Sequence, residues 1–255
     1  MFTDIIAELN DGILTIGINR PRHKNAITNA MYQRIADDLK NANESSDVRV
    51  VVLHGAETAF SSGNDIDEFT SRTSTENEPA SSHFMKALLH FQKPVIAAVN
   101  GPAVGIGATM LLHCDLVYAG ADAYVSFPFS RLGLCAEFAS SLALAHIVGY
   151  HRAAELLLLG ERCNADKAER LGIFNEVLPP ADVLPKAIAV GRTLSQLSQP
   201  ALFATKSLMR ARDTSLYEQQ RHLEMRRFTE LLDSPEAERA FQAFMSRRSA
   251  PGSAR

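Results

Sequence analysis

The segment from Pro94 to Asp115 constrains the fold of this chain more than any other. It begins with a strand-like apolar run, turns at Asn100-Gly101-Pro102, and then opens a short apolar helix at Gly105-Ile106-Gly107. Glycine tolerates unusual backbone angles and lets a ligand approach the backbone closely. The first N–H groups of a helix have no partner within the helix. The turn is therefore either purely structural or a place where an anion or a developing oxyanion can be held.

The order of strand-like and helix-like segments predicts an α/β fold with parallel strand pairing. Residues 48–53 are rich in valine, as expected of a strand buried on both faces, and residues 94–100 form a second such run. Each run follows a helix-like segment, and we expect Thr28 to cap the first of these helices. The pattern predicts a repeating strand–strand–helix layout.

Other elements follow from local patterns. Asn10-Asp11-Gly12 between two strand-like runs predicts a hairpin of residues 4–9 and 13–18. The polar residues 70–82 predict a mobile loop that could gate a site. Further strands are expected at 115–119, 124–127 and 174–178, and helices at 82–91, 140–148, 152–159 and 165–171. The remainder is helical, so we divide the chain into a core, 1–195, and a C-terminal helical oligomerisation region, 196–255.

Composition argues against several classes of protein. A net charge of −3 argues against nucleic-acid binding through a basic surface. No apolar run approaches the roughly 20 residues that a membrane-spanning helix needs. The three widely spaced cysteines predict reduced thiols in a cytosol-like compartment. Residues 1–10 lack a secretory signal pattern and the last residues are not a Ser-Lys-Leu peroxisomal address, so we expect a cytoplasmic location.

A second glycine-containing stretch, residues 60–66, follows the strand that ends near Gly55. Small residues around Gly63 allow backbone N–H groups to be exposed at the end of a strand, which is a common ligand position in α/β folds. The alternative is an ordinary surface turn.

Glu137 lies in a third stretch, residues 127–141, among Leu134, Cys135, Ala136, Phe138 and Ala139. Apolar surroundings favour the neutral form of a carboxylate, which would suit a general base. The alternative is an exposed glutamate that complements a helix dipole. No G-x-S-x-G, phosphate loop, H-E-x-x-H or C-x-x-C motif occurs, and the eight histidines show no ligand spacing, so we predict no metal site. His113 fits a core position better than a ligand.

These three stretches, in this order, resemble the enoyl-CoA hydratase/isomerase superfamily, which has the crotonase fold. The resemblance extends to Ile18-Asn19-Arg20-Pro21, Asn25-Ala26 and the helical C-terminus, and so covers nearly the whole chain. It implies a spiral of strand–strand–helix (ββα) repeats with a C-terminal helical region that builds homotrimers, often stacked as hexamers. It also implies an acyl-CoA thioester as substrate, with coenzyme A as part of that substrate and no separate cofactor.

The resemblance implies that the backbone N–H groups of Asn64 and Ile106 hold the thioester oxygen. Many family members have three consecutive glycines where this chain has Gly105-Ile106-Gly107, so we expect the side chain at 106 to narrow the space near the thioester. Substrate contacts are implied for Arg22, Asn25, Ala26, Ser61, Ser62, Gly63, Asp65, Ile66, Gly105 and Phe129, and for Lys206 as a ligand of a coenzyme A phosphate, from a neighbouring subunit.

The same resemblance indicates a branch of the superfamily. Hydratases use two glutamates to position water, and those positions fall on Thr109 and Phe129, neither of which can act as a general base. Glu137 instead occupies the place of the single catalytic glutamate in Δ3,Δ2-enoyl-CoA isomerases of the peroxisomal type. The prediction is an isomerase in which Glu137 moves a proton from C2 to C4. A hydratase with an unusual site, another thioester chemistry and a CoA-ester-binding protein without turnover remain as alternatives.

Overall fold

A six-stranded sheet forms the centre of the protein. The structure, a computed structural model, describes residues 4–56, 58–70 and 79–249. The strands lie in the order β1 (Ile5–Asn10), β2 (Ile13–Ile18), β3 (Val50–Gly55), β4 (Val95–Val99), β6 (Leu116–Gly120) and β9 (Glu176–Leu178). β1 and β2 form the predicted antiparallel hairpin, and every later neighbour pairs in parallel. The predicted parallel α/β layout is confirmed.

A second, three-stranded sheet contains β5 (Pro102–Val104), β7 (Tyr124–Ser126) and β8 (Arg162–Asn164). The sequence predicts β7 but not β5 or β8. Strands of three residues are too short to show an alternating pattern, and they form here because β7 offers a paired edge on each side.

Eleven helices are found in the described part of the chain. They are α1 (Asn29–Glu44), α2 (Ile66–Thr70), α3 (Ala80–Leu89), α4 (Ile106–Thr109), α5 (Ser140–Val148), α6 (Tyr150–Leu159), α7 (Ala165–Arg170), α8 (Pro180–Gln196), α9 (Gln199–Arg210), α10 (Asp213–Leu232) and α11 (Pro235–Ser249), with short 3-10 turns η1 (Pro21–His23), η2 (Met110–His113) and η3 (Ser130–Leu132). Thr28 caps α1 as predicted, since its side-chain oxygen accepts a hydrogen bond from the N–H of Met31 at 3.3 Å.

The polar stretch 70–82 differs in part from its prediction as a mobile loop. Residues 71–78 lie outside the described residues. The last part of the stretch already belongs to α3, where Ser81 and Ser82 are buried rather than exposed. The first residues of α3 are thus helical and buried although their polar composition is typical of a loop.

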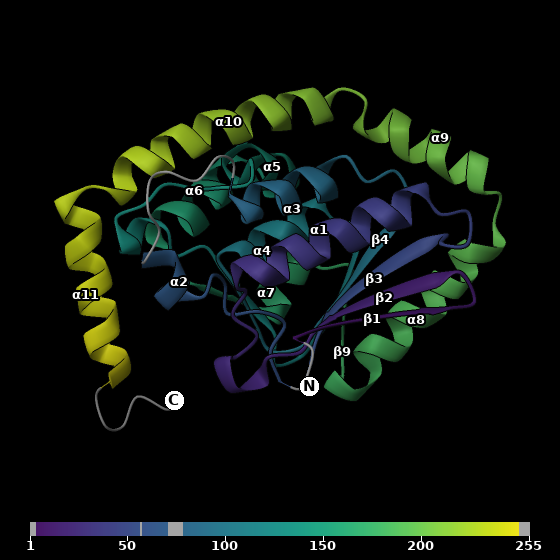
Figure 1. Cartoon of the computed structure of the whole chain (residues 1–255), viewed down its shortest axis with the longest axis horizontal. Helices are drawn as coiled ribbons and strands as arrows, with labels where there is room; N and C mark the ends of the chain where they lie inside the picture. Colours follow the sequence, from purple (N-terminus) through teal and green to yellow (C-terminus); the bar gives the residue numbers. More distant parts are fainter. Residues whose placement is uncertain (1–3, 57, 71–78, 250–255) are drawn as a thin grey trace.

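Alternation along β3 builds a core on each face of the large sheet. Val50 and Val52 pack towards α8, whereas Val51 and Leu53 pack in the larger cluster that includes α1 and α3. All four side chains are almost completely buried. Helices therefore cover both faces of the sheet, as the valine-rich run predicted (Figure 1).

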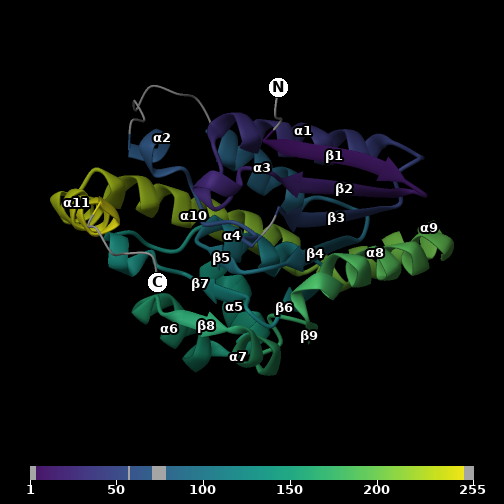
Figure 2. The ribbon, with the colours of Figure 1, turned by 90° about the horizontal axis from the view of Figure 1, so that it is seen from below.

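The C-terminal helices form an arc around the core (Figures 1 and 2). α10 packs on α3 and α5, and α11 packs on η3. Among the described residues, no helix is long and apolar enough to span a membrane, and no group of three or more His, Cys, Asp or Glu side chains is placed to hold a metal ion. The three cysteines all belong to the described part of the chain and are free.

Candidate active site

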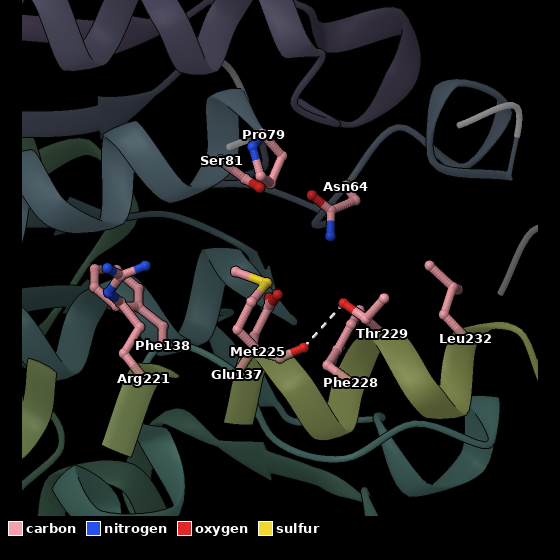
Figure 3. A pocket seen from close by; sticks show the side chains of 10 residues that line it. All are labelled: Asn64, Pro79, Ser81, Glu137, Phe138, Arg221, Met225, Phe228, Thr229 and Leu232. Carbon is pink, nitrogen blue, oxygen red and sulfur yellow. Dashed lines mark hydrogen bonds between the residues drawn. The ribbon is translucent and has the colours of Figure 1, made fainter. Parts of the chain in front are cut away.

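A cavity of about 160 Å³ lies between α10 and the loops that follow β3 and precede α5. Figure 3 shows two residues from the predicted site, Asn64 and Glu137, approaching this cavity from opposite sides. The residues that line it are Asn64, Pro79, Ser81, Glu137, Phe138, Arg221, Met225, Phe228, Thr229 and Leu232. The fold therefore brings together two predicted residues that are far apart in the sequence.

The segment that contains Asn64 runs beside the segment that leads into α4. Ser61 and Ala103 form a parallel bridge, in which the N–H of Ser61 donates to the carbonyl of Pro102 at 3.0 Å. The N–H of Val104 donates back to the carbonyl of Ser61 at 2.9 Å. The two predicted N–H donors, at positions 64 and 106, therefore belong to adjacent backbone segments.

Glycine allows these two segments to approach so closely. A Cβ atom on Gly107 would lie 2.7 Å from the backbone oxygen of Ser61, and one on Gly63 would lie 3.0 Å from that of Val104. Gly63 also has φ +99°, a conformation that side chains with a Cβ rarely adopt.

The backbone around Asn64 directs its N–H away from the neighbouring chain. The N–H of Ile27 donates to the carbonyl of Gly63 at 2.8 Å, and the N–H of Asp65 donates to the carbonyl of Ile27 at 2.9 Å. In this parallel bridge the N–H of Asn64 points to the side opposite Ile27. Ile106 is the first residue of α4, so its N–H has no partner within that helix. The N–H of Asn64 thus points away from Ile27, and the N–H of Ile106 lies in the first turn of α4.

The side chain of Ile106 is fully buried in the hydrophobic core and is not among the residues that line this cavity. Its expected effect on the space near the thioester stays a prediction. Gly105, the residue before it, has φ +56°, and a Cβ atom there would have no neighbour within 4 Å among the described residues.

Glu137 is held at the cavity by an unusual turn. The residue is only 8% exposed, and the two residues after it, Phe138 and Ala139, have φ values of 60° and 55°. A positive φ is uncommon outside glycine and is often found at functional sites. α5 begins at Ser140, whose N–H donates to the carbonyl of Glu137 at 3.1 Å. The turn therefore separates the carboxylate from the helix that follows it.

His113 supports this turn from the core. Its Nε2 lies 2.7 Å from the carbonyl oxygen of Phe138, and its ring stacks on that of Phe138 with centroids 4.0 Å apart. Burial lowers the pKa of His113 to about 3, so the ring is neutral and Nε2 carries the proton that it donates. The interpretation of His113 as a core residue rather than a ligand agrees with this environment.

Asn25 and Ser61 use their side chains to shape the loop. Asn25 is fully buried, and its amide nitrogen donates to the carbonyl of Ala59 at 2.6 Å. The Ser61 hydroxyl donates to the carbonyl of Asn25 at 2.9 Å and accepts from the N–H of Gly63 at 3.1 Å. Any contact of these two residues with a substrate would therefore come from their backbone.

Asp65 forms an ion pair with Arg20 at 2.5 Å, and both residues are largely buried. Burial raises the pKa of Asp65, but the hydrogen bonds and charge of Arg20 and nearby backbone N–H groups outweigh it and hold that pKa below its usual value. Arg20 also donates to the carbonyl of Ala26 at 3.2 Å. The pair thus joins η1 to the loop before α2.

The remaining predicted contacts lie in several places. Arg22 is exposed on η1, and Ser62 and Ile66 are partly exposed nearby. Phe129 is buried in the core rather than in the cavity wall. Lys206, on α9, is buried, and its ammonium group donates to Asp115 and to the carbonyl of Lys93, at 2.6 Å each. Within one chain its charge is therefore neutralised by Asp115.

The sequence analysis missed the contribution of α10 to the cavity. Five lining residues belong to this helix: Arg221, Met225, Phe228, Thr229 and Leu232. The last four follow the i, i+3, i+4, i+7 spacing of one helix face. That spacing could have indicated a buried face, although not what the face covers.

Known proteins of one family match this chain along most of its length. The model of the Enoyl-CoA hydratase/isomerase family matches residues 8–252. Enoyl-CoA delta isomerase 2 of Rattus norvegicus is 38% identical over 212 residues, which are 81% of this chain and 54% of that protein. The chain thus spans about half the length of that relative. The 2,3-dehydroadipyl-CoA hydratase of Escherichia coli (strain K12) is 28% identical over 96% of this chain and 97% of that protein.

Solved structures share the whole architecture. An enoyl-CoA hydratase/isomerase from Pseudoalteromonas atlantica T6c superposes with a TM-score of 0.93 at 33% identity, covering 97% of this chain and 98% of that chain. OdaA of Pseudomonas aeruginosa superposes with a TM-score of 0.92 at 43% identity, covering 95% of this chain and 98% of that chain.

Proposed function

The chain belongs to the enoyl-CoA hydratase/isomerase family, and we propose that it is an enzyme that moves a double bond of an acyl-CoA thioester, like a Δ3,Δ2-enoyl-CoA isomerase. One observation carries the proposal. Among the described residues that line the cavity, Glu137 is the one carboxylate, and Asn64 lies across the cavity from it. This supports a reaction that uses a single acid–base group.

The proposed reaction is a proton transfer from C2 to C4. Glu137 removes the C2 proton, the electron pair of the broken C–H bond forms a C1=C2 double bond, and the carbonyl π electrons move to the thioester oxygen, which gives a dienolate that keeps C3=C4. The backbone N–H groups of Asn64 and Ile106 hold the negatively charged thioester oxygen. Glu137 then returns the proton at C4: the C3=C4 pair forms the new C–H bond, the C1=C2 pair becomes the C2=C3 double bond, and the carbonyl is restored, so that substrate and product have the same mass. A buried carboxylate can shuttle the proton in this way if water is kept out of the cavity.

The two positions of the hydratase glutamates support the isomerase over the hydratase. Thr109 is fully buried, and its hydroxyl lies 3.4 Å from the carbonyl of Ile106, while Phe129 is buried in the core. Neither lines the cavity. A hydratase stays the second candidate, because the alignment with the E. coli hydratase covers nearly the whole chain.

An assay with two substrates tests the proposal. Purified protein is incubated separately with a 3-enoyl-CoA and a 2-enoyl-CoA, and the products are separated and weighed by mass spectrometry. We expect the 3-enoyl-CoA to become a 2-enoyl-CoA without a change of mass. A mass gain of one water from the 2-enoyl-CoA, without isomerisation, would replace the isomerase by the hydratase. CoA-ester binding without turnover would indicate another thioester chemistry or a binding protein.

We also propose a homotrimer, alone or stacked as a hexamer, in a cytoplasmic location. Large apolar side chains at the surface of α9 support an interface, since Leu208 is 79% and Met209 is 76% exposed in the single chain. Light scattering of the purified protein would give the mass of the assembly, and fractionation of cells would give its location.

A further inference from the structure

Glu224, on α10, is a buried carboxylate that contacts the turn after Glu137. It is 6% exposed and accepts hydrogen bonds from the backbone N–H of Ser141 at 3.0 Å and from the Ser141 hydroxyl at 2.5 Å. Gln220, one turn earlier on α10, donates to the same hydroxyl at 2.8 Å. A residue 83 positions away in the sequence thus caps the start of α5.

The hydrogen bonds of Glu224 reach the backbone directly after a strained turn. Phe138 and Ala139 are consecutive non-glycine residues with positive φ, a conformation that persists only when the surroundings impose it. His113 holds the first of them through its carbonyl, and Glu224 holds the N–H of Ser141, two residues after Ala139. The turn that places Glu137 is therefore fixed from both sides.

The same helix forms a wall of the cavity. Met225 follows Glu224 directly and lines the cavity, as does Arg221 one turn earlier. Arg221 donates to the hydroxyl of Ser82 at 2.7 Å, which ties α10 to α3 as well. Glu224 therefore fixes the distance between the wall that carries Met225 and the wall that carries Glu137.

We infer that Glu224 is a positioning residue for Glu137: its carboxylate holds the 138–141 turn so that Glu137 points into the cavity at the substrate. The inference rests on the proposed function of Glu137 as the acid–base group. Burying a carboxylate is unfavourable, and an apolar pair would join α10 to α5 at lower cost. The carboxylate of Glu224 accepts a hydrogen bond from the backbone N–H of Ser141, at the end of the strained turn. An apolar side chain could not do this, which gives the buried carboxylate a role.

The test compares Glu224→Ala, Glu224→Gln and Ser141→Ala with the wild-type protein. We expect Glu224→Ala to lower kcat by about 10- to 100-fold, since a displacement of about 1 Å of a catalytic group has effects of this size, while KM changes less than twofold. Glu224→Gln keeps an amide oxygen that can accept the same hydrogen bonds, so it should recover most of kcat. Ser141→Ala removes one donor and should lower kcat about threefold. The matched control is Glu230→Gln, because Glu230 is exposed on the same helix and pairs with Arg227.

Thermal unfolding of each variant separates positioning from a loss of fold. A folded Glu224→Ala protein with kcat within twofold of wild type would overturn the inference, as would equal losses in Glu224→Ala and Glu224→Gln. If the wild-type protein isomerises neither substrate, the proposed function fails on its own. Amide hydrogen exchange of residues 139 and 141 then decides about the turn, with faster exchange in Glu224→Ala supporting the inference and unchanged exchange refuting it.

Discussion

The backbone oxygen of Ser61 occupies the position that a side chain on Gly107 would need, because a Cβ atom there would lie 2.7 Å from this oxygen. The two segments that carry the proposed oxyanion donors, Asn64 and Ile106, are in contact at this point. The two segments can lie this close because residue 107 is a glycine and has no Cβ atom.

Gly107→Ala should force these segments apart and weaken the hold on the thioester oxygen. We expect kcat to fall by about 100-fold or more, the usual consequence of losing one oxyanion donor. Gly191→Ala is the control, because its Cβ would meet the Ile13 side chain at 3.4 Å, an ordinary contact far from the cavity. Steady-state kinetics on both variants, with circular-dichroism melts to verify folding, check the prediction. An active Gly107→Ala protein would show that the close approach is unnecessary.

Glu137→Gln should abolish turnover without loss of binding. The amide has nearly the same shape but cannot accept the C2 proton, so we expect kcat to fall by at least about 1,000-fold. Calorimetric titration with a saturated acyl-CoA should give a Kd within about threefold of wild type. Glu161→Gln, at an exposed surface pair with Arg131, should leave both values unchanged. Near-normal rates in Glu137→Gln would remove this residue from the mechanism.

Tyr32→Phe should loosen Asn64. The buried Tyr32 hydroxyl donates to the side-chain oxygen of Asn64 at 2.5 Å. Loss of this hydrogen bond should lower the free energy of unfolding by about 1 kcal/mol. Because the Asn64 backbone would be less fixed, kcat should fall about threefold to tenfold. Urea unfolding and kinetics measure the two effects, and Tyr124→Phe, away from the cavity, should change neither.

His113 should make stability depend on pH. Its pKa is about 3 in the folded protein, because burial disfavours the charged ring, and about 6.5 in an unfolded chain. Between these values the unfolded chain binds a proton here that the folded protein does not. The contribution of neutral His113 to the free energy of unfolding is thus fully present above pH 6.5. It is lost as pH falls towards 3, by up to about 1.4 kcal/mol per pH unit.

The measurement is urea unfolding of wild type and His113→Gln at pH 7, 6 and 5. Glutamine can still donate to the carbonyl of Phe138 but does not titrate, so its stability should fall less steeply with acidification. The two curves should therefore converge as pH decreases. Parallel curves would mean that folding does not lower the pKa of His113.

Local patterns in the sequence determined most of the elements, although not the short strands β5 and β8. Three features could be predicted without knowing the fold, because each depends on residues only a few positions apart. They are the Asp-Gly turn, the Thr28 cap and the burial of β3 on both faces. The stretches that contain Asn64 and Glu137 show locally as a glycine-containing turn after a strand and a glutamate among apolar residues, but only the family resemblance assigned the two residues their roles.

Only the tertiary structure decided how the cavity is closed and how Glu137 is held. No local sequence pattern marks the positive φ angles of Phe138 and Ala139, because distant residues hold this turn: His113 contacts Phe138, and Glu224 contacts Ser141. The periodicity of α10 shows that one face is buried, but a helix face does not specify its partner. These features depend on packing between segments far apart in the sequence, which local chemistry does not encode.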